Sequence, residues 1–123
     1  MSWEVELHED VDRWFENLCR TDPCTANLVE QAIDLLAEIG PALGRPLVDR
    51  IKGSCYLHMK ELRPASTGPQ KIRVLFAFDP LRQAILLIAG DKSGDWQGWY
   101  DKNIPVAEQR YAAHLATRHE EER

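Results

Sequence analysis

The stretch KIRVLFAFDPLRQAILLIAGDK, residues 71–92, decides the fold. Its first half alternates apolar and other side chains, which predicts a strand with one apolar face. That face consists of Ile72, Val74, Phe76 and Phe78. Arg73 then points to the opposite face. After a turn at Asp79-Pro80, residues 84–89 are all apolar, as in a central strand covered on both faces. The stretch predicts a hairpin or meander that carries a cation on one side and packs helices on the other.

Length and composition indicate one domain over residues 1–123, with 44% hydrophobic and 28% charged residues, as in an ordinary soluble protein. No stretch approaches a membrane span and the N-terminus lacks the pattern of a signal peptide, so we expect a cytoplasmic protein. The odd count of cysteines and the absence of a CxxC pair favour reduced, mostly buried thiols. We therefore expect no disulfide framework, no metal site and no cofactor.

Charge is distributed unevenly along the chain. Residues 1–47 carry ten acids and three bases, whereas residues 48–92 carry four acids and eight bases, so the middle third is basic in a chain of net charge -5. Such a patch is an electrostatic footprint for phosphate. The alternative is that these cations only discourage edge-to-edge aggregation of the strands.

Periodicity predicts the order of the elements. We expect a strand over 3–7, a helix from Glu9 or Asp10 to Asp22, a second helix ending at Gly40, a loop over 41–54 with at most a short strand, strands over 56–63, 71–78 and 84–89, and a last helix from Ile104. The apolar positions of the strand over 56–63 fall out of phase. A bulge or a second apolar surface could explain this.

The fold class that follows is α+β. It has an N-terminal strand, two helices, a three-stranded antiparallel meander and a C-terminal helical segment. Residues 95–103 hold Trp96, Trp99 and Tyr100 in a short turn or helix, where aromatic rings are more often core plugs than binding residues. The last residues, about 117–123, are expected to form a flexible tail.

The order of these elements, together with three short motifs, resembles the RelE/ParE toxin superfamily, and more closely its HigB-like, phage Gp49-related branch. The motifs are KELR at 60–63, IRVLF at 72–76, and ILLIAGDK at 85–92, followed by a helix with Ile104-Pro105, Ala107, Glu108, Arg110 and Tyr111. The resemblance implies a RelE-like fold and a toxin of a type II toxin-antitoxin pair. HigB-type toxins cleave mRNA on the ribosome, and a helix-turn-helix (HigA-like) antitoxin neutralises them.

The resemblance also implies which residues act. Arg73 matches the strand arginine of the family and is expected to bind the scissile phosphate and stabilise the transition state. Lys60 and Lys92 are the other candidate catalytic residues of a metal-independent endoribonuclease. The candidate RNA-binding residues are Arg63, Lys71, Lys52, His58 and Tyr100. We expect Arg73 to emerge on an open face of the sheet among Lys60, Lys71 and Lys92.

The sequence also allows other roles for some of these residues and other functions for the protein. Arg63 could instead pair with an acid of an N-terminal helix, and His58 could be a structural histidine, while His114 is expected to face solvent. Trp96, Trp99 or Tyr100 could supply a ring that stacks on a base or orients a phosphate. Many family members have two lysines after the last strand, where this chain keeps only Lys92. A ParE-like poison of DNA gyrase, or an inactive toxin-fold protein that only binds its partner, are therefore the alternative functions.

Overall fold

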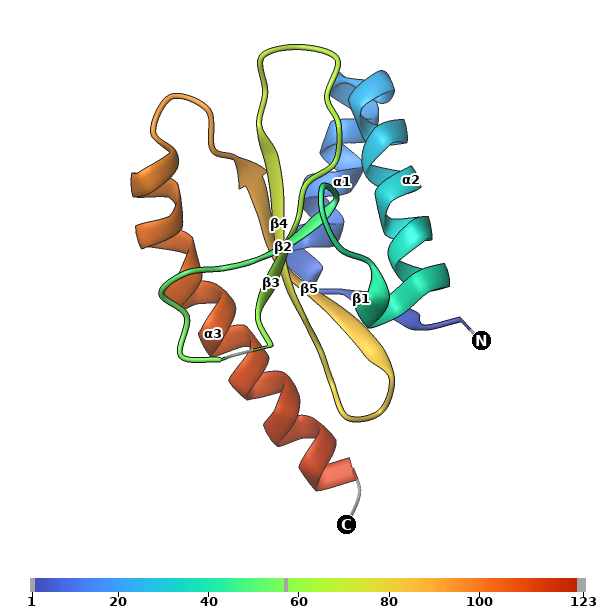
Figure 1. The fold of residues 1–123 in the computed structure, drawn as a ribbon, viewed down its shortest axis with the longest axis vertical. Coiled ribbons are helices and arrows are strands. Elements are labelled where there is room, and N and C mark those ends of the chain that lie inside the picture. Colours follow the sequence, from blue (N-terminus) through green and yellow to red (C-terminus); the bar gives the residue numbers. More distant parts are fainter. Residues whose placement is uncertain (1, 57, 122–123) are drawn as a thin grey trace.

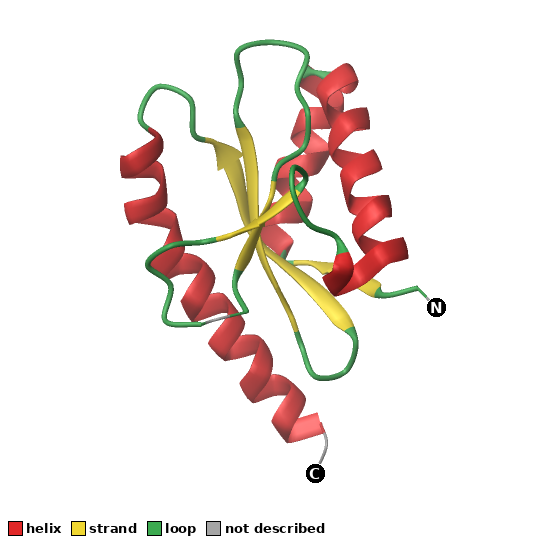
Figure 2. Cartoon of the chain, viewed as in Figure 1, coloured by secondary structure: helices red, strands yellow, loops and turns green. Residues whose placement is uncertain are grey.

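The computed structural model describes residues 2–56 and 58–121, with the backbone alone from 118 onward. Its helices and strands are β1 (Glu4–Leu7), α1 (Glu9–Thr21), α2 (Pro23–Ile39), η1 (Gly40–Ala42), β2 (Val48–Arg50), β3 (Lys60–Leu62), β4 (Ile72–Phe78), β5 (Gln83–Asp91) and α3 (Trp96–Glu121). Figure 1 follows them along the chain, and Figure 2 shows the strands lying between the helices. This arrangement confirms the predicted α+β class and RelE-like fold.

One sheet organises the described residues, with the strand order β1-β5-β4-β3-β2. β1 runs parallel to β5, and the other neighbours are antiparallel. The predicted meander is therefore β3-β4-β5. The short strand allowed for in residues 41–54 is β2, which adds a fifth strand at the edge beside β3.

Helices cover the sheet on both sides, since α1 and α2 lie on one side and α3 lies along the other (Figure 1). Successive side chains of β4 point to opposite faces of the sheet and so contribute to both cores. Val74 and Phe76 belong to the core under α1 and α2, whereas Leu75 and Ala77 belong to the core under α3. The sequence predicted the first core, but it did not predict that a helix covers the face of Arg73.

The ends of α2 follow from local chemistry. Asp22 caps the helix, because its carboxylate accepts hydrogen bonds from the backbone N and the Oγ1 of Thr25, and Pro23 occupies the first turn. Gly40 ends the helix with a φ of 71°, in the left-handed region. A Cβ at Gly40 would clash with the indole Nε1 of Trp3, so the absence of a side chain at this position leaves room for the tryptophan ring.

α3 begins earlier than the sequence predicted. We expected the last helix to start at Ile104-Pro105, but one helix runs from Trp96 with Pro105 inside it. Asp95 starts this helix, because its Oδ1 accepts the backbone N–H of Gly98 at 3.0 Å. The aromatic segment over 95–103 is thus the first part of the helix that covers the sheet.

The strand predicted over 56–63 is only Lys60–Leu62. Leu62 packs under α1 and α2, while Met59 packs under α3, so the second apolar surface explains the irregular phase. Leu57 lies outside the described residues. The expectation of buried thiols was wrong, because Cys19, Cys24 and Cys55 are all exposed. No helix in the described part of the chain is long and apolar enough to cross a membrane.

Candidate nucleic-acid interface at the end of the sheet

A buried carboxylate, Glu61, lies at the centre of the basic residues. It is 2% exposed on β3, on the face that α3 covers. Its Oε1 accepts a hydrogen bond from Nε of Arg63 at 2.7 Å and lies 4.0 Å from Nε of Arg73. Its Oε2 accepts a short hydrogen bond from the hydroxyl of Tyr100 on α3. Residues from β3, β4 and α3 are therefore joined through one negative charge.

Arg73 lies on the face opposite the aromatic side chains, as predicted, but that face is not open. The N-terminal part of α3 lies over it, and the Arg73 side chain is only 14% exposed. Its Nη1 donates to the backbone oxygen of Ile72 at 2.8 Å. Its Nε is buried and has no hydrogen-bond partner among the described residues. The guanidinium is thus held at the floor of a groove.

Two grooves meet beside this cluster, because both are lined by Lys92 and Trp96. One has a volume of about 570 Å³, and its charged lining residues are Arg45, Asp49, Arg50, Lys52, Glu61, Arg63 and Lys92. The other has a volume of about 450 Å³ and is lined by Lys71 and Arg73 as well. Cations outnumber acids in both, so the grooves favour an anionic ligand.

The cluster shifts several ionisation equilibria. Burial, and then the hydrogen bond to Glu61, raise the pKa of Tyr100 to about 12. Burial, and then the charge of Arg73, lower the pKa of Lys92. Burial opposes ionisation of Arg63, but the hydrogen bond to Glu61 and the negative charges of Glu61 and Asp49 together outweigh burial, so the pKa of Arg63 is raised. At neutral pH Tyr100 is therefore a hydrogen-bond donor, and Lys92 releases its proton more readily than an ordinary lysine.

The structure brings most of the predicted site residues to this place. The two grooves are lined by Arg73, Lys92, Arg63, Lys71, Lys52 and Tyr100. Arg63 pairs with Glu61 and, at 3.3 Å, with Asp49, so its carboxylate partners come from the sheet rather than from an N-terminal helix.

Lys60 and His58 lie elsewhere. Lys60 neighbours Glu61 on β3 and therefore points to the other face, where its Nζ lies 5.7 Å from the ring centroid of Phe78. With His58 it lines a separate pocket beside Pro41. The structure thus does not bring these two residues to Arg73.

The sequence-based interpretation missed Glu61 as part of the interface, and for Trp96 it favoured a core plug over a base-stacking ring. A signal for Glu61 was available, because it is the acid inside the KELR motif of an otherwise basic segment. Trp96 is 59% exposed and is therefore no core plug.

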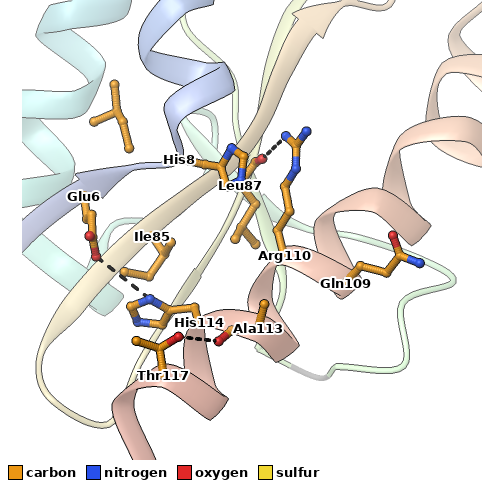
Figure 3. A pocket seen from close by; sticks show the side chains of 10 residues that line it. Glu6, His8, Ile85, Leu87, Gln109, Arg110, Ala113, His114 and Thr117 are labelled. Atoms are coloured by element: carbon orange, nitrogen blue, oxygen red, sulfur yellow. Dashed lines mark hydrogen bonds and ion pairs between the residues drawn. The ribbon is translucent and has the colours of Figure 1, made fainter. Parts of the chain in front are cut away.

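A further pocket of about 360 Å³ lies between β1, β5 and the C-terminal half of α3 (Figure 3). His114 does not face solvent as expected, because it bonds to the buried Asp79 at 2.8 Å and lies 3.9 Å from Glu6. Arg110 donates to the backbone oxygen of Leu87 and pairs with Asp10. These contacts tie α3 to β5 and α1, which is a structural role. The described residues offer no cluster of His, Cys, Asp or Glu that could hold a metal ion.

Comparison with known proteins decides the family. The family described as "Phage derived protein Gp49-like (DUF891)" matches residues 16–112, which include strands β2 to β5 and the residues that line the two grooves. The chain belongs to this Gp49-like family. It is 54% identical to "Putative toxin HigB3" of Mycobacterium tuberculosis (strain ATCC 25618 / H37Rv) over 115 residues, which cover 94% of this chain and 96% of the relative.

A second relative in the same organism, "Putative toxin HigB2", is 49% identical over 116 residues. The match covers 94% of this chain but only 56% of that longer protein. Both similarities confirm the HigB-like resemblance read from the sequence.

Proposed function

We propose that this Gp49-like protein is the toxin of a type II toxin-antitoxin pair and that it cleaves mRNA on the ribosome. The observation that carries the proposal is the cluster of Arg63, Arg73, Lys92 and Tyr100 around the buried Glu61, which opens into a cationic groove. The family and the names of the two relatives support the toxin assignment.

The chemistry of RNA cleavage matches these groups. Attack by the 2'-hydroxyl on its own phosphate needs a phosphate held in line, stabilisation of added negative charge and proton transfer. In this proposal Arg73 binds the phosphate from the floor of the groove, and Arg63 and Lys71 add positive charge beside it. The 2'-oxygen forms a bond to phosphorus while the bond from phosphorus to the 5'-oxygen breaks, which gives a 2',3'-cyclic phosphate and a 5'-hydroxyl. Lys92, whose pKa is lowered, donates the proton that the leaving 5'-oxygen gains, and water accepts the proton that the 2'-hydroxyl loses. None of these steps requires a metal ion.

Charge and burial support the proposed dependence on the ribosome. The whole chain has a net charge of -5, so long-range attraction to free RNA is weak. Arg73 is also mostly buried and reaches only a phosphate that is led into the groove. The ribosome supplies that orientation, and a helix-turn-helix antitoxin is the expected partner that neutralises the protein. In this proposal basic side chains of that partner bind the exposed acidic residues of α1, which are Glu9, Asp10, Asp12 and Glu16.

The experiment replaces Arg73 with Ala and with Lys and measures cleavage of a translated mRNA together with growth after expression. Arg73→Ala should lower the cleavage rate by about 10² to 10³, as loss of a preorganised donor to the transition state does. Arg73→Lys keeps a charge but not the planar fork and should recover only part of the activity. The matched control is Arg20→Ala, which removes an exposed arginine at the end of α1.

The fold must be checked in the same experiment. Because Arg73 is buried beside Glu61, its removal should lower the free energy of unfolding by about 1–3 kcal/mol, yet leave the protein folded at 25 °C. A folded Arg73→Ala variant with full toxicity would overturn the mechanism. Inhibition of DNA supercoiling with intact mRNA would favour the gyrase poison, and a harmless wild-type protein that binds its antitoxin would favour the inactive alternative.

A further inference from the structure

Trp96, the first residue of α3, is an unusual side chain for the surface of this protein. Four large hydrophobic side chains are exposed in the described part of the chain, and Trp96 is the most exposed of them at 59%. The next tryptophan of α3 behaves differently. Trp99 packs against β5, where a Cβ on Gly90 would lie 2.8 Å from its indole Nε1. Trp99 therefore packs this end of α3 against the sheet, and the exposed ring of Trp96 is not needed for that packing.

The surroundings of Trp96 are cationic and aromatic. The ammonium group of Lys92 lies 5.7 Å from its ring centroid and 5.3 Å from that of Tyr100. Tyr100 meets Trp96 edge-on, with ring centroids 6.4 Å apart and planes at 78°. Trp96 also lines both grooves, so the cations of each groove flank it. An exposed aromatic ring between two cationic grooves is the combination that proteins use to bind single-stranded nucleic acid.

We propose that Trp96 is a stacking platform for an unpaired nucleobase, and that the phosphates on either side of that base lie in the two grooves. The inference rests on the proposed function, because it assumes that the groove of Arg73 receives RNA. The inference adds a subsite for one nucleobase to the groove that holds the phosphate in the proposed function. The ligand class is single-stranded RNA, since a base inside a duplex is already stacked and cannot lie on the indole.

A protein partner is the competing occupant, because tryptophan and arginine are also frequent in protein interfaces. Charge favours RNA. Cations outnumber acids in both grooves beside Trp96, and the second groove has Lys71, Arg73 and Lys92 without a carboxylate among its lining residues. Stacking on Trp96 is also independent of base identity, because every base has a π-face.

The test measures binding of two fluorescein-labelled probes at low ionic strength. One is a 2'-O-methyl octa-adenylate, which cannot be cleaved through its own 2'-hydroxyl, and the other is the same octamer with abasic sugars throughout. Trp96→Ala should weaken binding of the octa-adenylate about tenfold and leave binding of the abasic octamer unchanged. Trp96→Phe should restore most of the affinity. The matched control is Leu81→Ala, which removes another exposed hydrophobic side chain at the β4–β5 turn.

Other results would overturn the inference. These are equal losses for both probes, an effect no larger than that of Leu81→Ala, no binding of the octa-adenylate by the wild type, or a loss of antitoxin binding with RNA binding intact. The outcome is separable from that of the proposed function. Cleavage of translated mRNA by Trp96→Ala at the wild-type rate would remove the subsite and keep the nuclease. Base-dependent binding through Trp96 without any cleavage would keep the subsite and remove the nuclease.

Discussion

Neutralising Glu61 tests whether this carboxylate organises the groove. Glu61→Gln keeps nearly the same shape, so the packing of β3 against α3 should persist. The carboxylate now accepts from both Arg63 and Tyr100 and lies 4.0 Å from Nε of Arg73. An amide has only one acceptor oxygen, so either the Nε–H of Arg63 or the hydroxyl proton of Tyr100 loses its acceptor.

Stability should fall for this reason. Leaving one buried donor without an acceptor, and three cations without their shared counter-charge, should lower the free energy of unfolding by about 1–3 kcal/mol at neutral pH. For a domain of this size that corresponds to a decrease in Tm of about 4 °C for each kcal/mol.

Ionisation of Tyr100 is the more specific readout. Its pKa is raised to about 12, first by burial and then by the hydrogen bond to Glu61. The variant removes the contribution of Glu61 and keeps burial, so the pKa of Tyr100 should fall by about one unit. At pH 11 the phenol would then be about half ionised in Glu61→Gln and about one-tenth ionised in the wild type.

The same shift predicts a pH dependence of stability. Since the folded pKa of Tyr100 lies above the ordinary value of 10.0, its stabilising effect is fully present below pH 10 and is lost as the pH rises toward about 12. After allowance for the partial exposure of the ring, this amounts to about 1–2 kcal/mol in the wild type. The alkaline loss should be smaller in Glu61→Gln.

The assay is an NMR titration of protein labelled with ¹³C at the tyrosine Cζ, in which Tyr100→Phe assigns the resonance. Asp49→Asn is the matched control, because Asp49 lies in the same groove and pairs with Arg63 at 3.3 Å but is not among the groups that shift the pKa of Tyr100. An unchanged pKa of Tyr100 in Glu61→Gln, or an equal shift in Asp49→Asn, would refute the organising role of Glu61.

Two further predictions concern the scaffold. Gly90→Ala places a methyl group 2.8 Å from the indole of Trp99 and should lower the free energy of unfolding by about 1–3 kcal/mol in urea denaturation, whereas Gly44→Ala, with no atom within 4 Å, should have little effect. Asp22→Ala removes the cap of α2 and should lower the free energy of unfolding at pH 7. The hydrogen bonds of Thr25 lower the pKa of Asp22, so the cap is lost as the carboxylate is protonated. The difference in free energy of unfolding between Asp22→Ala and the wild type should therefore narrow as the pH falls below 3.8, the ordinary pKa of an aspartate. An equally unstable Gly44→Ala, or a constant difference in acid, would contradict the respective argument.

The alternation of side chains made much of the sheet predictable. Ile72 to Phe78 and the apolar run after it lie in β4 and β5, and Arg73 lies on the predicted face. The face was expected to be open because the segment around Trp96 and the helix around Tyr111 read as separate elements. They form one helix through Pro105, since Asp95 caps the earlier start.

The membership of the site was harder to predict, because it depends on how strands pair. Lys60 and Arg73 are both cations of neighbouring strands, but Glu61 pairs with Leu75, so Lys60 falls on the other face. No local pattern specifies that register. Burial of Glu61 was likewise hidden, because its hydrogen-bond partner Tyr100 lies 39 positions away along the chain.

The parallel pairing of β1 with β5 has a consequence for synthesis. Glu4 lies beside Gln83, so the sheet cannot close until most of the chain has left the ribosome. Until then α1 and α2 can form only a helical hairpin whose apolar side has no sheet to cover. A product that ends before residue 91 therefore lacks β5 or part of it, and it also lacks Trp96 and Tyr100. Interrupted translation should yield an unfolded fragment for proteolysis, rather than a shorter protein with a working groove.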